Sequence, residues 1–148
     1  MVSSIIDQEI KKAMLAKDQA SLRGLRAIKA ALLVARTEKG SAEEITEDAE
    51  MKILQRLIKQ RKESSDIYKQ QGREDLAVIE DEEIAVISQF MPQQLSKEEV
   101  EVLIAKIITE SGAITMKDMG RIIGLANKEL AGKADGKLIA EIVKTQLA

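Results

Sequence analysis

Apolar residues recur at every third or fourth position along most of the chain, the spacing that places side chains on one face of an α-helix. In residues 4–17, for example, Ile5, Ile6, Ile10 and Met14 follow this spacing. The same spacing predicts seven helices in all, and no stretch shows the strict alternation of a strand. We expect the helices to begin near residues 4, 18, 46, 74, 96, 115 and 135.

The ends of the predicted helices carry capping signals. Ser96 and Glu99 form a capping box, in which each side chain satisfies a free backbone N–H at the start of a helix. Glycines at the far ends can adopt the left-handed conformation that closes a helix. Pro92 is the only proline and separates the first four helices from the last three. The sequence therefore predicts an N-terminal domain of residues 1–91 and a C-terminal domain of residues 93–148.

The composition favours helices over strands. Hydrophobic residues make up 45% of the chain, yet Tyr68 and Phe90 are the only aromatic residues. The core must therefore be aliphatic, and Ala, Leu, Glu and Lys are good helix formers. We predict an all-α protein, with a helical N-terminal unit of about four helices followed by a small three-helix C-terminal domain.

Two missing residue types exclude several kinds of chemistry. The chain contains neither cysteine nor histidine. This excludes disulfides, thiolate and imidazole metal sites, and nucleophiles activated by histidine. We predict no self-contained catalytic site, no metal and no cofactor. Carboxylates and lysines remain, so catalysis is disfavoured rather than excluded.

Charge and hydropathy point away from membranes and from a strongly basic surface. The 23 Lys and Arg residues face 25 Asp and Glu residues, which gives a net charge of −2. The most apolar stretch, residues 27–35, contains Lys29 and is much shorter than the ~20 residues of a membrane span. The first residues lack the apolar segment of a signal peptide. We expect a cytoplasmic protein with no membrane partner.

Two rows of basic residues have two interpretations. They could hold phosphates, or they could form solvated faces paired with acids such as Glu38, Glu50 and Glu63. The near absence of aromatic side chains that stack on bases favours the solvated faces. The first row comprises Arg23, Arg26, Lys29 and Arg36, and the second comprises Lys52, Arg56, Lys59, Arg61 and Lys62.

Two other polar stretches are predicted to face solvent. Residues 59–66 contain no apolar side chain, so this half of the third helix has nothing to bury. Residues 80–83 are all acidic. They could bind a divalent cation, but consecutive helical residues point in different directions. A charged outer face is the favoured interpretation.

Two glycines lie inside the sixth predicted helix. Gly120 and Gly124 fall four residues apart, on one face, and each costs about 1 kcal/mol relative to alanine. Close helix packing would compensate for this cost, and so would close approach of a ligand such as an RNA backbone. The neighbouring apolar residues Ile123 and Leu125 favour packing.

The turn before the last predicted helix has the composition of an anion site. Lys133 and Lys137 flank it, and a helix start offers free N–H groups to an anion. The spacing is not that of a phosphate-binding P-loop. Asp135 can cap this helix and would repel a phosphate there, so the turn is interpreted as a connection between helices.

These segments resemble the GatB/YqeY family, and in particular its free-standing YqeY-like members. In the last third of the chain the resemblance rests on Lys117-Asp118-Met119-Gly120, on Gly124, and on Gly132-Lys133-Ala134-Asp135-Gly136. Further upstream it rests on Lys59-Gln60-Arg61-Lys62, Gly72-Arg73-Glu74-Asp75-Leu76 and Phe90-Met91-Pro92-Gln93-Gln94-Leu95-Ser96. Together these motifs cover nearly the whole chain.

The resemblance implies a role beside tRNA. The C-terminal unit is similar to the tail of the GatB subunit of glutamine-dependent aminoacyl-tRNA amidotransferase, which contacts tRNA while the chemistry occurs elsewhere. That tail commonly has proline at the position of Gly136. The implied nucleic-acid contacts are Lys117, Arg121, Lys133 and Lys137. The implied structural motif comprises Gly120, Gly124, Gly132, Asp135 and Gly136.

The sequence therefore predicts a tRNA-associated accessory binding protein related to this amidotransferase. Two alternatives stay open. One is a contribution to carbon–nitrogen ligase activity with glutamine as the amide donor. The other is an adaptor that binds a protein partner in translation without nucleic acid.

Overall fold

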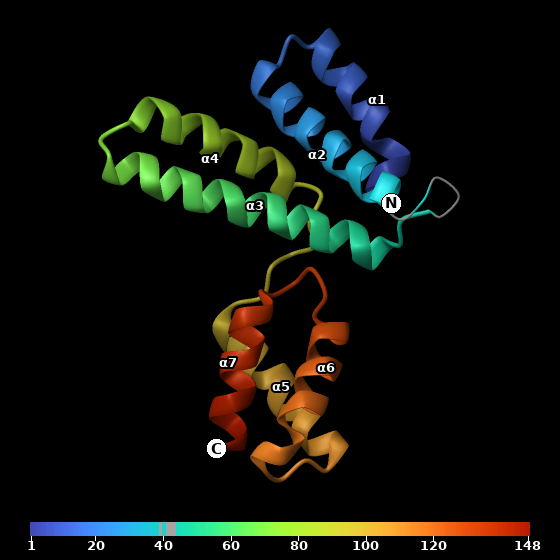
Figure 1. The fold of residues 1–148 in the computed structure, drawn as a ribbon, viewed down its shortest axis with the longest axis vertical. Coiled ribbons are helices and arrows are strands. Elements are labelled where there is room, and N and C mark those ends of the chain that lie inside the picture. The colour runs from blue at the N-terminus through green and yellow to red at the C-terminus, as the bar shows by residue number, and fades with distance from the viewer. Residues whose placement is uncertain (39, 41–43) are drawn as a thin grey trace. The chain divides into compact units, whose positions relative to one another are not determined.

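The structure, a computed structural model, describes residues 1–38, 40 and 44–148, and this part of the chain is helical without strands (Figure 1). The all-α prediction is confirmed. The chain divides into two compact units, Met1–Met91 and Pro92–Ala148, each with its own apolar core. The described helices are α1 (Val2–Leu15), α2 (Gln19–Glu38), α3 (Glu47–Gln70), α4 (Glu74–Ser88), α5 (Lys97–Ser111), the short 3-10 helix η1 (Met116–Asp118), α6 (Met119–Glu129) and α7 (Gly136–Leu147).

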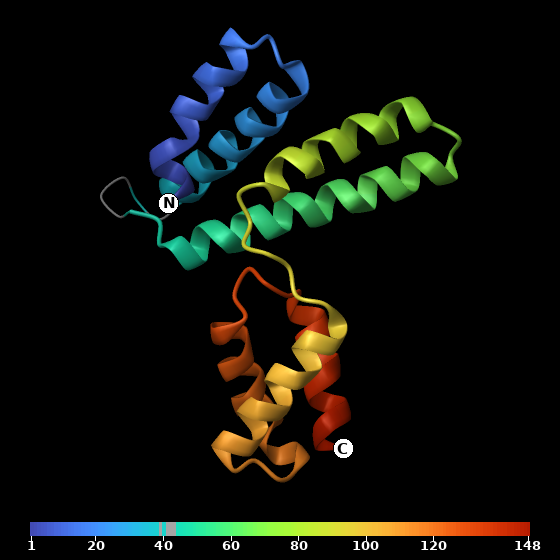
Figure 2. The same cartoon turned by 180° about the vertical axis from the view of Figure 1, so that it is seen from behind.

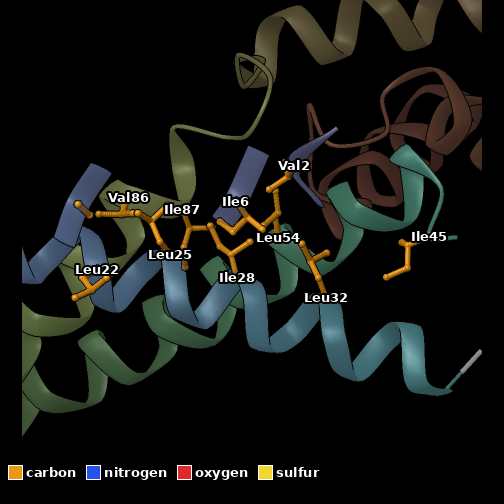
Figure 3. Packing of buried hydrophobic residues seen from close by; sticks show 11 residues of the cluster. Val2, Ile6, Leu22, Leu25, Ile28, Leu32, Ile45, Leu54, Val86 and Ile87 are labelled. Atoms are coloured by element: carbon orange, nitrogen blue, oxygen red, sulfur yellow. The ribbon is translucent and has the colours of Figure 1, made fainter. Parts of the chain in front are cut away.

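The N-terminal unit consists of two helical hairpins, α1 with α2 and α3 with α4 (Figures 1 and 2). Helix α2 packs against both α1 and α4. Its fully buried Ile28 lies among Ile6, Leu54 and Ile87, which come from the other three helices (Figure 3). The core is aliphatic, as the composition requires.

A glycine sets the distance between α2 and α4. A methyl group added at Gly24 would lie 2.7 Å from Cγ1 of Val86, which is too close for a real side chain. Beside this contact, Arg23 donates to Glu82 at 2.6 Å. The sequence does not mark Gly24 as a packing residue, because a single glycine within a helix has no characteristic spacing.

The start of α1 is capped by a side chain from another helix. Glu50 of α3 is fully buried, and its carboxylate accepts from Val2 N at 3.0 Å and from Ser3 N at 2.9 Å. A carboxylate at a helix N-terminus satisfies free donors and matches the helix dipole. The expectation that Glu50 pairs with the basic row of α3 is therefore wrong.

Helix α1 ends two residues before the predicted boundary. Its last residue is Leu15, and Lys17 adopts a left-handed conformation with φ 56°. Asp18 then accepts from Ser21 N at 3.1 Å and caps α2 as predicted. Ile5 and Met14, expected on the buried stripe, are 41% and 56% exposed.

Helix α4 covers the polar half of α3. Arg61 donates to Glu83 at 3.2 Å, and Ser65, only 2% exposed, donates to Asp81 at 2.7 Å. Lys69 also reaches Asp81 at 3.4 Å. The prediction that residues 59–66 face solvent is wrong for the side toward α4, since polar side chains can pack between helices when they bond to one another.

The C-terminal unit is a three-helix domain formed by α5, α6 and α7 (Figures 1 and 2). Ser96 caps α5 by accepting from Glu99 N at 3.2 Å, which confirms one half of the capping box. The Glu99 carboxylate accepts from the Ser96 hydroxyl at 3.1 Å. The segment before α5 forms two hydrogen bonds with the turn before α7. Gln94 Nε2 donates to Gly132 O at 2.6 Å, and Leu95 N donates to Lys133 O at 2.9 Å. The shared core includes the fully buried Val100, Ile104, Ile122 and Val143.

Candidate nucleic-acid-binding surface

The start of α6 is built by a threonine cap and a short ion pair. Thr115 caps η1, with its side chain accepting from Lys117 N at 3.4 Å. Asp118 accepts from Ile114 N and also pairs with Arg121, both at 3.2 Å. Arg121 thus pairs at the start of its own helix while its side chain stays 53% exposed. Lys117 is exposed and makes no ion pair within the described residues.

The two glycines of α6 lie on its open face. Gly120 and Gly124 are both exposed, and a methyl group added at either would meet nothing within 4 Å. The interpretation that these glycines serve helix packing is therefore wrong. The packing side of α6 is the opposite one, which buries Ile122 and Ala126. Gly120 and Gly124 leave a strip of helix backbone uncovered by side chains.

A buried glycine whose carbonyl accepts a hydrogen bond stabilises the turn between α6 and α7. Gly132 is buried with φ 76°, a conformation that favours glycine, and its carbonyl accepts from Gln94. Asp135 caps α7 by accepting from Lys137 N at 3.5 Å, as predicted. The cap occupies a donor that an anion would use. The lysine side chains at 133 and 137 remain exposed and unpaired within the described residues.

Asn127 connects the two glycine motifs. Its Oδ1 lies 3.9 Å from the position of a methyl group added at Gly136, the first residue of α7. Asn127 follows Gly124 by three residues and is exposed on the same side of α6. The folded unit thus places the strip of α6 next to the start of α7. Asn127 was not among the predicted site residues, although it lies three and seven residues after the two glycines, at helical spacing.

The four basic residues predicted to contact nucleic acid fall into two pairs in this unit. Lys117 and Arg121 lie at the start of α6, whereas Lys133 and Lys137 lie around the turn before α7. Lys128, exposed in the last turn of α6, adds a cation between them along the chain. We call the exposed residues Gly120, Gly124 and Asn127 with these five cations the α6 face.

The acidic run at residues 80–83 is occupied by internal contacts. Asp81, Glu82 and Glu83 bond to residues of α3 or α2. The hydrogen bond from Ser65 lowers the pKa of Asp81. Burial raises the pKa of Glu80, the nearby Glu83 adds to the rise, and Arg61 opposes it. In the described residues, no three acidic side chains gather as metal ligands would. Asp81 and Glu82 are exposed, as a charged outer face requires, and Asp81, Glu82 and Glu83 also bond to neighbouring helices.

Comparison with known proteins identifies the family. A family model described as Yqey-like protein matches residues 3–147. The chain belongs to the YqeY-like family. It is also 28% identical over 129 residues to "Altered inheritance of mitochondria protein 41, mitochondrial" of Clavispora lusitaniae, a match that covers 86% of this chain and 72% of that protein. The family resemblance seen in the sequence motifs is confirmed.

Among the described residues, none of the helices combines the length and the apolar character needed to cross a bilayer.

Proposed function

We propose that this YqeY-like protein is a tRNA-associated accessory binding protein that contacts RNA through the α6 face. The observation that carries the proposal is the exposed strip at Gly120 and Gly124. Gly124 lies inside α6, where glycine costs about 1 kcal/mol relative to alanine, whereas Gly120 lies in the first turn of the helix. No packing contact at either glycine compensates for its lack of a side chain. A strip without side chains admits a close ligand backbone instead.

The charges around the strip suit a phosphate backbone. Lys117, Lys128, Lys133 and Lys137 are exposed and make no ion pair within the described residues. Lysine side chains attract phosphates without reading sequence. The resemblance of this unit to the amidotransferase tail supports tRNA as the RNA, because that tail contacts tRNA.

The test uses the opposite effects expected of one substitution on stability and on binding. Gly124→Gln puts a better helix former at an open position, so we expect the protein to become more stable by about 0.5–1 kcal/mol. The added side chain covers the strip, so affinity for unfractionated tRNA should fall by about tenfold or more. Filter binding measures the affinity, and urea unfolding followed by circular dichroism measures the stability.

A matched control lies elsewhere in the same unit. Val102 is 70% exposed on α5, and Val102→Gln should leave tRNA binding unchanged. Lys133→Glu and Lys137→Glu should each weaken binding, more strongly at low salt. Wild-type affinity of Gly124→Gln, or binding that is independent of salt, would contradict the proposal.

The two alternatives give different results in the same preparation. Amide formation by the purified chain with glutamine and ATP would support a contribution to carbon–nitrogen ligation. Co-purification of a stable protein partner without nucleic acid would support an adaptor. Neither result is expected from a protein whose α6 face binds tRNA.

Cytoplasmic localisation belongs to the proposal as well. The relative from Clavispora lusitaniae carries "mitochondrial" in its name. The experiment therefore has to distinguish a cytoplasmic from a mitochondrial location. Cell fractionation with an antibody against the native protein should place it in the cytosolic fraction.

A further inference from the structure

The outer side of α3 carries a row of cations. Lys52, Arg56, Lys59 and Lys62 are all exposed and follow one another at helical spacing of three or four residues. At 1.5 Å of rise per residue, the row is about 15 Å long. We call these four residues the α3 basic row.

None of the four cations is neutralised by a contact within the described residues. They form no ion pair there, in contrast to Arg61 and Lys69 on the same helix, which pair with α4. Residues 51–62 contain no acid at all. The nearest exposed acids of α3, at positions 48, 63 and 66, lie at the ends of the row and make no ion pair with it.

Other acids near the row are used elsewhere, whereas the exposed Asp48, Glu63 and Asp66 each lie four residues from a lysine of the row. Glu50 is buried at the start of α1. The acids of α4 bond to Arg23, Arg61, Ser65 and Lys69, away from the row. Like charges three or four residues apart repel each other on a helix. The fold therefore leaves the four cations without an ion pair within the described residues, with exposed acids only toward the two ends of the row.

We propose that the α3 basic row is a second binding surface, which holds the phosphate backbone of RNA. This goes beyond the proposed function, which places the RNA contact on α6 in the other unit. The row presents several cations in a line, the arrangement that neutralises consecutive phosphates without sequence readout.

The chemistry of the row distinguishes RNA from other anionic partners. A helix that lies on a membrane exposes apolar residues beside its cations, and protein-binding surfaces centre on buried aromatic or apolar anchors. Within the row the exposed side chains are cationic or amide. Ile67, the exposed large apolar residue of α3, lies beyond its end. A polar polyanion is the partner that this surface fits.

The test is the salt dependence of RNA binding by the full-length protein. The triple variant Lys52→Gln, Arg56→Gln and Lys59→Gln keeps helix-forming residues at exposed positions, so circular dichroism should be unchanged. With labelled unfractionated tRNA, the slope of log affinity against log salt should become shallower by about 2–3, since each phosphate contact contributes about 0.7–0.9. The affinity at low salt should fall by about tenfold or more.

A control variant removes the same charge elsewhere on the N-terminal unit. Lys11, Lys17 and Arg26 are exposed and unpaired within the described residues, and their combined change to glutamine should leave the slope unaltered. The inference is overturned if the α3 variant binds like wild type. It is equally overturned if the control loses as much affinity, because net charge alone then explains the effect.

Two competitors decide between partners, and one variant separates this inference from the proposed function. Poly-glutamate or anionic vesicles that bind the α3 row as tightly as tRNA would overturn the assignment to RNA. If the α3 variant weakens binding while Gly124→Gln does not, the α3 surface stands and the α6 face fails. The reverse result removes the α3 surface and retains the α6 face.

Discussion

The buried carboxylate of Glu50 holds the first turn of α1 through two hydrogen bonds, to Val2 N and Ser3 N. Both donors belong to the set that a helix cannot satisfy by itself. A charged acceptor at this place also interacts favourably with the helix dipole. One side chain of α3 thereby fixes where α1 begins.

Replacing this carboxylate should therefore destabilise the N-terminal unit. We expect Glu50→Gln to lower the free energy of unfolding by about 1–3 kcal/mol, because it removes the charge and one acceptor while the site stays buried. Urea unfolding followed by circular dichroism measures the change. Glu47→Gln, at an exposed position in the same turn, should cost a few tenths of a kcal/mol to about 1 kcal/mol. Equal effects of the two substitutions would show that the cap contributes nothing.

Glycine serves two opposite purposes in this protein. Gly24 is buried and lets α4 approach, because Val86 occupies the space of a side chain. Gly120 and Gly124 have nothing within 4 Å of that space. The same residue type thus brings two helices together in one unit and leaves a helix surface bare in the other.

At the scale of elements, polar contacts join residues 61–69 of α3 to residues 81–83 of α4. Ser65 and Lys69 both bond to Asp81, and Arg61 pairs with Glu83. The side chains of Arg61 and Glu83 are 18% and 16% exposed, so this pair is largely shielded from water. Shielded pairs depend on the presence of both partners more than exposed ones do.

The pKa of Asp81 gives this hairpin an acid sensitivity. Its carboxyl titrates below its usual range in the folded protein, chiefly through the hydrogen bond from Ser65. At acidic pH the folded state then binds fewer protons than the unfolded state. The stabilising effect of the Asp81 carboxylate is therefore complete above the usual pKa of aspartate, and it is lost as pH falls through the lowered pKa. We expect Asp81→Asn to reduce the loss of stability on acidification.

Unfolding by urea between about pH 2 and 7 measures this effect. Glu80 provides a control of opposite sign. The raised pKa of Glu80 means that the fold disfavours its charged form. Its contribution to the free energy of unfolding is therefore lost as pH rises rather than as pH falls. Glu80→Gln should therefore reduce the loss of stability that accompanies a rise in pH. Identical pH profiles for wild type and Asp81→Asn would exclude a role for this carboxylate.

At the scale of the whole molecule, the two units have separate apolar cores that share no residue. The proposed RNA contacts lie on both, on α3 in one and on the α6 face in the other. The net charge does not reveal these two cationic surfaces, because acids exceed bases by two over the whole chain. Local pairing decides which cations are available.

Separate cores lead to a prediction about fragments. We expect residues 1–91 and residues 92–148, expressed separately, each to give a helical circular dichroism spectrum and a cooperative thermal transition. The smaller fragment should have the lower stability, because a short chain buries a smaller fraction of its surface. A C-terminal fragment without a cooperative transition would show that its fold depends on the first unit.

The sequence by itself determined the all-α class, the helices to within a few residues of their ends, the caps at Ser96, Asp18 and Asp135, and the family. These follow from local spacing, from backbone hydrogen bonds near each helix end, and from motifs contiguous in the chain. Each depends on residues a few positions apart, so no tertiary contact is needed to find them.

Only the tertiary structure decided which polar residues are used inside the fold and which remain free. Glu50, Ser65 and Asp81 look like surface residues in the sequence, yet they bond across helices. Gly124 looks like a packing residue and is open instead. The physical reason is that burial and pairing depend on which helices meet and on which sides, and helical spacing in one segment carries no information about its neighbour.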